Sequence, residues 1–206
     1  DNGHIMTETL SAASYREGAF TAMDDNSQVS AEDVGGTLSG SVGEAGESFS
    51  FEGIQISSID LRLIKDLENN GLIPEGSFEY HLGLVKGAQI SSDIPLYAYA
   101  LVMDGDKVSY IFSHYVPASV DVSESVKTML NLARVDELSE VSYTWLKNTI
   151  VNNGRIRDTY YMVTGSVDGS EAIGAYSDIM EIAVLEDDRD LFSRICAIEG
   201  ARVATY

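Results

Sequence analysis

Three segments of the 206-residue chain place apolar residues three or four positions apart, which is the spacing of one face of an α-helix. They run from about Ser58 to Asn69, from Asp121 to Ala133 and from Glu137 to Val151. The first and third segments run into the tripeptide Asn-Asn-Gly, and glycine tolerates the left-handed backbone conformation that commonly follows a helix. The sequence therefore predicts three helices, two of them with well-marked ends.

Other segments are predicted to be β-strands. Phe78 to Leu84 alternates apolar with polar or small residues, which is the period of a strand. Leu96 to Met103 and Lys107 to Tyr115 flank Asp104-Gly105, a dipeptide that tolerates the positive φ of a tight hairpin turn. The connections are short, which favours antiparallel neighbours. The predicted fold class is α+β, with mostly antiparallel sheets and packing helices.

Two stretches of the chain resemble each other. Asn69-Asn70-Gly71 matches Asn152-Asn153-Gly154, and in the residues that follow Phe78 aligns with Tyr160. Self-similarity at a fixed offset is the sequence signature of a repeated structural unit. The pattern therefore predicts an internal duplication, in which a unit of one helix and three strands occurs twice.

The chain divides into three parts on this interpretation. Residues 1–47 form a flexible, acidic arm, because the Gly/Ser-rich run from Gly35 to Gly46 offers little apolar surface to offset the entropy of ordering. Asp1 to Ile5 within it has the look of a tag remnant. Residues 48–134 and 135–206 are the two α+β units, and we expect them to pack as one globular domain.

The charge of the chain limits its partners. There are 33 acidic and 13 basic residues, for a net charge of −20, and the densest basic spot is Arg155 with Arg157. A polyanion repels phosphate backbones and anionic lipid surfaces. We therefore expect no nucleic-acid partner and no membrane partner. The acidity can give solubility, suit a salty medium or steer a basic partner.

The sequence also bears on compartment and redox state. No stretch reaches the ~18 to 20 apolar residues of a membrane helix, and Asp1 to Met6 lacks the features of a secretory signal. We expect a soluble protein, cytoplasmic or part of a virion rather than secreted. Cys196 is the single cysteine, so an internal disulfide is excluded, and its apolar neighbours predict a buried thiol.

His81 and His114 are the candidates for acid–base chemistry. In the predicted strand His81 shares a face with Glu79, and a neighbouring carboxylate can tune an imidazole as a general base. His114 follows Ser113, but the chain has no Gly-x-Ser-x-Gly elbow that would support a Ser/His/Asp triad. A histidine without a catalytic role is the simpler interpretation at both positions.

Metal and cofactor binding are not predicted. Three histidines and one cysteine cannot build a typical zinc site, and no acidic cluster has the alternating oxygens and central glycine of a calcium loop.

Tyrosine is abundant, with eleven residues. Tyr160 and Tyr161 are adjacent in a predicted strand and must face opposite sides, so we expect Tyr160 in the core and Tyr161 at the surface. Tyr115 is a second candidate for the surface. Exposed tyrosines suit protein interfaces, because a rigid amphipathic ring contributes contact area at low entropic cost.

Two classes of function are compatible with these features. The first is a non-enzymatic protein-binding or assembly module, such as a structural component of a larger complex or virion or an acidic chaperone-like binder, with a protein partner or self-association. The second is a small-molecule-binding protein or enzyme with a pocket between the two repeated units, using Glu79, His81 or His114.

Overall fold

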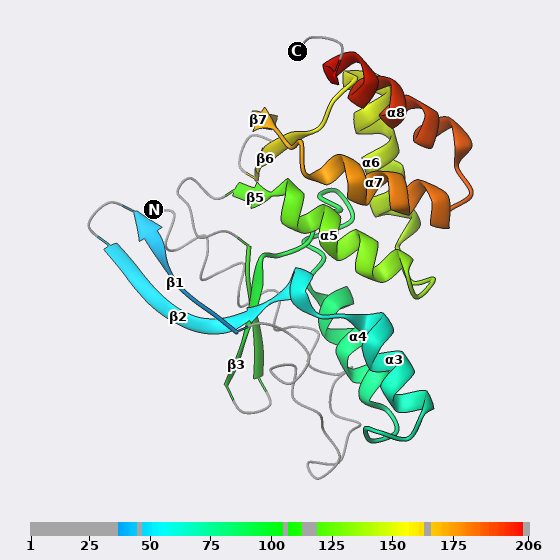
Figure 1. The fold of residues 1–206 in the computed structure, drawn as a ribbon. Coiled ribbons are helices and arrows are strands. Elements are labelled where there is room, and N and C mark those ends of the chain that lie inside the picture. Colours follow the sequence, from blue (N-terminus) through cyan, green and yellow to red (C-terminus); the bar gives the residue numbers. More distant parts are fainter. Residues whose placement is uncertain (1–36, 45–46, 105–106, 113–118, 163–165, 204–206) are drawn as a thin grey trace.

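The computed structural model describes residues 37–44, 47–104, 107–112, 119–162 and 166–203 of the chain. These residues form two antiparallel sheets with helices packed beside them, which confirms the predicted α+β class (Figure 1). In chain order the elements are β1 (Thr37–Glu44), β2 (Glu47–Gln55), the 3-10 helix η2 (Ile56–Ser58), α3 (Leu61–Asn69), α4 (Ser77–Gly87), β3 (Ala100–Asp104), β4 (Lys107–Ile111), β5 (Ser119–Asp121), α5 (Val122–Ala133), α6 (Glu140–Asn153), β6 (Arg157–Tyr161), β7 (Ser166–Glu171), α7 (Ala175–Leu185) and α8 (Arg189–Val203).

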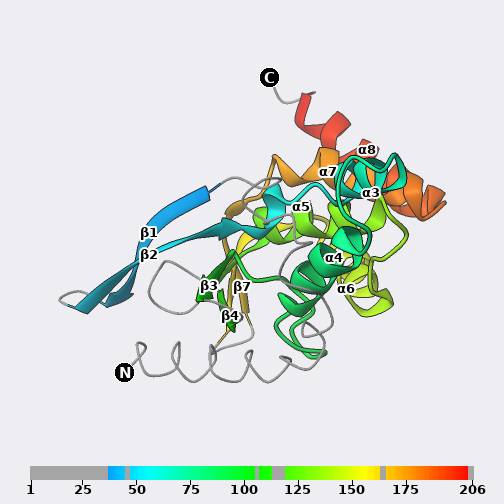
Figure 2. The same ribbon diagram turned by 90° about the horizontal axis from the view of Figure 1, so that it is seen from below.

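The first sheet has the strand order β1-β2-β3-β4. β1 and β2 pair along their full length, from Thr37 with Ile54 to Glu44 with Glu47. β2 pairs with β3 only at its end, where Ile54 faces Leu101. The β1–β2 hairpin therefore projects beyond the rest of the sheet (Figure 2).

The hairpin predicted around Asp104 is confirmed. β3 and β4 are antiparallel neighbours, and their register closes at Asp104 with Lys107. β3 begins later than predicted, because the residues before it are held by other partners: the amide of Tyr97 donates to the Ser125 hydroxyl of α5 over 3.0 Å. Backbone polar groups satisfied in this way do not take part in a strand ladder.

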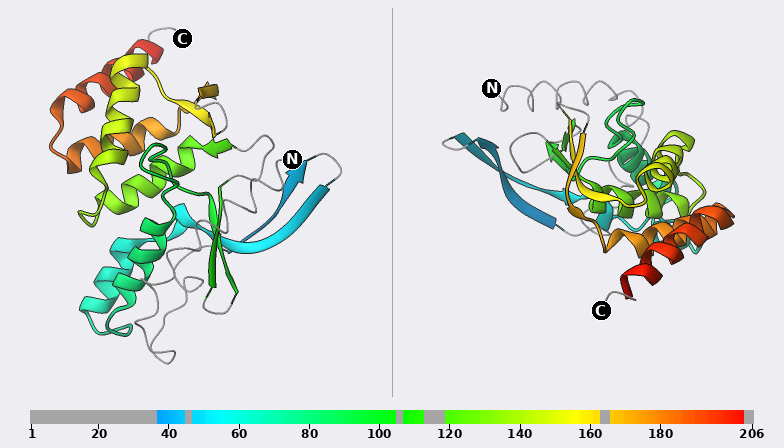
Figure 3. Two further views of the ribbon diagram at one scale, coloured as in Figure 1. Left: turned by 180° about the vertical axis from the view of Figure 1, so that it is seen from behind. Right: turned by 90° about the horizontal axis from the view of Figure 1, so that it is seen from above.

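Helix α5 lies between the two halves of the molecule. It contacts η2 and α3 on one side, α7 on the other, and strands β5 and β6 (Figures 1 and 3). Asp121 ends β5 and also caps α5, since its carboxylate accepts a hydrogen bond from the Glu124 amide over 3.0 Å. β5 in turn pairs with β6 in the second sheet, whose order is β5-β6-β7. The predicted helix from Asp121 to Ala133 is thus confirmed and joins the second sheet to the core.

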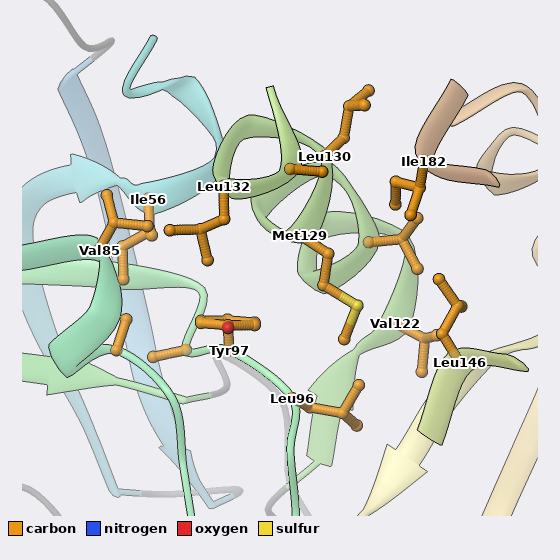
Figure 4. Packing of buried hydrophobic residues seen from close by; sticks show 14 of the residues in the cluster. Ile56, Val85, Leu96, Tyr97, Val122, Met129, Leu130, Leu132, Leu146 and Ile182 are labelled. Carbon is orange, nitrogen blue, oxygen red and sulfur yellow. The ribbon is translucent and has the colours of Figure 1, made fainter. Parts of the chain in front are cut away.

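The core is built on both sides of α5. Met129 and Leu132 are fully buried. Figure 4 shows Leu132 directed toward Ile56 of η2, while Leu130 is directed toward Ile182 of α7. Burying a side chain of this size is worth about 1.5–3 kcal/mol relative to leaving it in water. The apolar side chains of α5 therefore hold elements that are far apart in the sequence.

The predicted ends of α3 and α6 are confirmed. Gly71 and Gly154 adopt φ values of +67° and +65°, the left-handed conformation that favours glycine. The Gly154 amide donates to the Ile150 carbonyl over 2.9 Å and satisfies one of the free carbonyls at the end of α6.

The segment predicted as a strand from Phe78 to Leu84 is helix α4, so this prediction is wrong. Tyr80, His81, Leu82 and Leu84 are all buried. A helix that is covered on most sides carries apolar residues all round and lacks the single apolar stripe of a surface helix. Because α4 has apolar residues on most of its sides, some of them fall at alternate positions and imitate the pattern of a β-strand.

The predicted duplication is not confirmed. Helix α4 follows α3, whereas strands β6 and β7 follow α6, so Phe78 lies in a helix and its aligned residue Tyr160 lies in a strand. The second half then ends in α7 and α8, where the repeat predicts further strands. The shared tripeptide Asn-Asn-Gly reflects the common chemistry of helix ends.

Part of the predicted flexible arm is a strand. Residues 37–44 form β1, because main-chain pairing with β2 does not depend on large side chains and satisfies the backbone groups of this Gly/Ser-rich run. The rest of the arm, residues 1–36 and 45–46, lies outside the described residues.

Candidate functional site

The structure separates the predicted pair Glu79 and His81. Both lie in α4, where positions two apart point in different directions, and His81 is fully buried while Glu79 is exposed. Nδ1 of His81 donates to the Ser77 carbonyl over 2.7 Å, and its ring lies edge-on to Tyr80. The prediction that the two side chains share a face is therefore wrong, and His81 belongs to the core.

The structure describes one of the two tyrosines predicted at the surface, Tyr161, and does not describe Tyr115 or His114. Tyr161 lies in β6, opposite Ser119 of β5 and Ser166 of β7, and is half-buried, whereas Tyr160 is buried as expected. Tyr115 and His114 fall outside the described residues. Among the described residues, Tyr161 of β6 lies apart from α4, which carries Glu79 and His81 (Figure 1).

Cys196 is exposed, which corrects the prediction of a buried thiol. It lies in α8, whose buried residues Leu191 and Ile195 are four positions apart and form one stripe. Cys196 follows Ile195 directly and so points away from that stripe.

A carboxylate and a buried tyrosine meet where β7 leads into α7. The Tyr176 hydroxyl donates to Oε1 of Glu171 over 2.5 Å, and the hydroxyl oxygen of Tyr176 accepts from the Ile156 amide over 3.3 Å. Tyr176 is buried and Glu171 is half-buried. The amide of Ala172 also donates to the Ile156 carbonyl over 3.0 Å. These bonds fix the position of one carboxylate oxygen at the edge of the sheet.

Tyr176 is held in its neutral form by this environment. Burial, and then the negative charge and hydrogen bond of Glu171, raise the pKa of the Tyr176 phenol to about 12. The phenol therefore acts as a permanent hydrogen-bond donor to Glu171 at neutral pH.

The β6–β7 hairpin beside Glu171 depends on a glycine. Gly169 has φ of +82°, and a Cβ atom there would stand 2.0 Å from Oδ1 of Asp158. The Arg157 guanidinium donates to the Gly169 carbonyl over 2.6 Å. Arg157 is also the cross-strand partner of Glu171, next to an irregularity in the ladder. Gly169 thus lets an aspartate and an arginine of β6 pack against the backbone of β7.

A pocket of about 410 Å³ opens between this hairpin and the end of α6. It is lined by Thr149, Asn153, Arg155, Arg157 and Val167. All five lie in the second predicted unit, so this pocket is not formed between the two predicted units.

Asp188 ties α6 to α8. Its carboxylate accepts hydrogen bonds from the Leu191 amide (2.9 Å) and the Tyr143 hydroxyl (2.6 Å), and it pairs with the Lys147 ammonium. The Leu191 amide, followed by Lys147 and Tyr143, lowers the pKa of Asp188 to about 2. This cluster is a structural link, since both oxygens of the Asp188 carboxylate accept bonds from within the fold.

Within the described ranges, no group of three histidine, cysteine, aspartate or glutamate side chains is arranged to hold a metal ion. In that same part of the chain, no helix is both long enough and apolar enough to cross a bilayer.

The fold resembles that of a solved structure described as a novel α-amylase from Clostridium perfringens. The two chains share 25% sequence identity with a TM-score of 0.58, and the similarity covers 69% of this chain and 42% of that chain. This chain therefore spans less than half of the length of that neighbour. No family model matches this chain, and no curated protein matches it.

Sequence reasoning missed Glu171 and Tyr176. Their contact depends on the turn between β7 and α7, and the sequence predicts no helix at α7. The sequence contained one signal, Gly169, which precedes Glu171 by two residues. A glycine within a strand often marks a place where another group approaches the backbone closely. Arg155 and Arg157 stand out in the sequence as the densest basic spot, but nothing there places Thr149 or Asn153 beside them.

The Tyr176 phenol gives a test of this geometry by alkaline titration. We expect the ultraviolet difference spectrum between the native chain and Tyr176→Phe to show one phenol with a pKa near 12. In Glu171→Gln the pKa should fall toward the usual ~10, because the neighbouring charge is lost. Since the unfolded phenol ionises first, the stability contributed by this group is present below pH ~10 and is lost as the pH rises toward 12. A native Tyr176 that titrates near pH 10 would contradict the Glu171 contact.

Proposed function

We propose that this chain acts on a neutral glycan, with the carboxylate of Glu171 as its general base or nucleophile. The observation that carries the proposal is the structural similarity to an α-amylase over 69% of the chain. This proposal develops the second class of function that the sequence allows, a small-molecule-binding protein or enzyme, but with a different set of residues.

The geometry of Glu171 suits such a role. Glycoside hydrolysis uses two carboxyl groups, one of which is ionised and either activates water or attacks the sugar. The Tyr176 hydroxyl fixes Oε1, and among the described residues Oε2 has no hydrogen-bond partner, so it is the oxygen that a substrate would meet. A side chain oriented in advance loses little entropy when the substrate binds.

The charge of the chain is compatible with this substrate class. A net charge of −20 repels polyanions but exerts no net force on an uncharged sugar chain. An α-linked glucan, the substrate class that the name α-amylase denotes, is neutral.

Hydrolysis by the usual mechanism needs a second carboxyl group about 5–9.5 Å from the first. Asp158 of β6 is the candidate, because its Oδ1 lies against Gly169, two residues before Glu171. Asp158 also accepts a hydrogen bond from the Thr159 hydroxyl over 2.9 Å, which orients its carboxylate.

Release of reducing sugar from soluble starch and maltoheptaose tests this proposal. Glu171→Gln should lower kcat by about 10²- to 10⁴-fold, the usual contribution of a general acid or base. Glu79→Gln removes a carboxylate of the same kind from an exposed position on α4 and should leave kcat unchanged. Asp158→Asn should lower kcat as well. Absence of both hydrolysis and maltoheptaose binding in the native chain would overturn the proposal, as would full activity in Glu171→Gln.

Self-association is the second candidate, favoured by apolar side chains at the turn between α7 and α8. Val184 and Leu185 at the end of α7 and Phe192 in the first turns of α8 are exposed. Exposed apolar residues that gather in one place mark interaction surfaces. We propose that a second copy of the chain would cover this cluster.

Size-exclusion chromatography with light scattering tests the second candidate at physiological salt, where charge repulsion is screened. We expect a dimer in the native chain and a shift toward monomer in Leu185→Gln. Leu72→Gln, which changes a more exposed leucine before α4, serves as the control and should stay dimeric. A native species of 22.3 kDa at every concentration would contradict the proposal.

A further inference from the structure

The pocket between α6 and the β6–β7 hairpin concentrates positive charge in a strongly negative molecule. The whole chain has 13 basic residues against 33 acidic ones, yet Arg155 and Arg157 line the same pocket. Arg155 lies in the bend that precedes β6 and Arg157 begins the strand, and both residues line this one pocket. Thr149 and Asn153 face them from one side of α6, because positions four apart on a helix are neighbours.

The two arginines differ from the paired basic residues of the fold. Within the described residues Lys86, Lys127, Arg134, Lys147 and Arg202 each form an ion pair with a carboxylate. In that same part of the chain, neither Arg155 nor Arg157 forms an ion pair with a carboxylate. Two neighbouring cations repel each other, and an anion that binds between them removes this repulsion.

The donors of the pocket are held in place. Arg157 is half-buried, and one of its nitrogens donates to the Gly169 carbonyl, so the guanidinium plane is fixed while its other donors stay available. Arg155 follows Gly154, whose left-handed conformation ends α6 and turns the chain toward β6. The amide of Asn153 adds a neutral donor beside the two charges.

We infer that this pocket binds a small anion that carries a carboxylate or a phosphate group. Planar guanidinium groups bind both groups through paired, charge-assisted hydrogen bonds. A volume of about 410 Å³ accommodates a ligand of the size of a sugar acid or a sugar phosphate. The inference does not require the proposed reaction at Glu171, because this residue is the cross-strand partner of Arg157 but does not line the pocket.

Calorimetric titration of the full chain with inorganic phosphate, glucuronate and glucose tests the inference. We expect phosphate or glucuronate to bind, with an affinity that falls as KCl is raised, and glucose not to bind at this pocket. Binding by both anions assigns the pocket to the shared charge, whereas binding by one alone assigns it to a phosphate or to a carboxylate ligand. Absence of binding by either anion would overturn the inference.

Charge-removing variants locate the binding. Arg155→Gln and Arg157→Gln should each weaken anion affinity by about tenfold or more, the loss expected for one charge-assisted hydrogen bond. Arg155 is exposed, so its variant keeps the fold even if Arg157→Gln disturbs the hairpin. Arg194→Gln, an exposed arginine of α8, removes the same charge elsewhere and should bind as the native chain does. Native affinity in Arg155→Gln would overturn the inference. Glu171→Gln should not weaken anion binding, which separates this site from the proposed glycan reaction.

Discussion

Burial of α5 is the constraint on which the rest of the structure depends. The helix has apolar side chains on both flanks, so it must be covered on one side by η2 and α3 and on the other by α7. Its polar positions add specific contacts. The Glu124 carboxylate accepts hydrogen bonds from Gln55 and Ser57, and the Asn131 amide group donates to the Ser57 and Ile59 carbonyls. Satisfied polar groups of this kind fix the angle at which the helix meets the first half.

The candidate sites are positioned by the same helix. Asp121 both ends β5 and caps α5, so the second sheet starts at a point anchored in the core. β6 and β7 extend that sheet, and α7, which supplies Tyr176, packs along α5. The Glu171 carboxylate and Arg157 of the cationic pocket thus lie across from each other at the open end of one hairpin. A neutral glycan at the first and a small anion at the second are both compatible with an acidic surface, because neither requires a broad basic patch.

The sequence predicts local features well where one residue type decides the outcome. Gly154 and Gly71 mark helix ends, and Asp104 marks a hairpin, because only certain residues tolerate these backbone conformations. α4 escapes prediction because its burial on several sides depends on contacts with distant elements. β1 could not be predicted from its Gly/Ser-rich sequence, because its backbone hydrogen bonds are completed by pairing with β2. The Glu171–Tyr176 contact could not be predicted either, because it depends both on the turn between β7 and α7 and on α7 itself.

Native-state hydrogen exchange in increasing urea tests the central claim that α5 unites the two halves in one cooperative core. The account predicts that the slowest amides of β3 (Leu101), α5 (Leu130) and β6 (Tyr160) share one free energy of opening. In Leu132→Ala the free energies of opening of all three amides should fall together by about 2–5 kcal/mol, because a cavity beside α5 weakens the packing on both of its sides. A free energy for Tyr160 well below that for Leu101, or a loss in Leu132→Ala confined to one half, would contradict it.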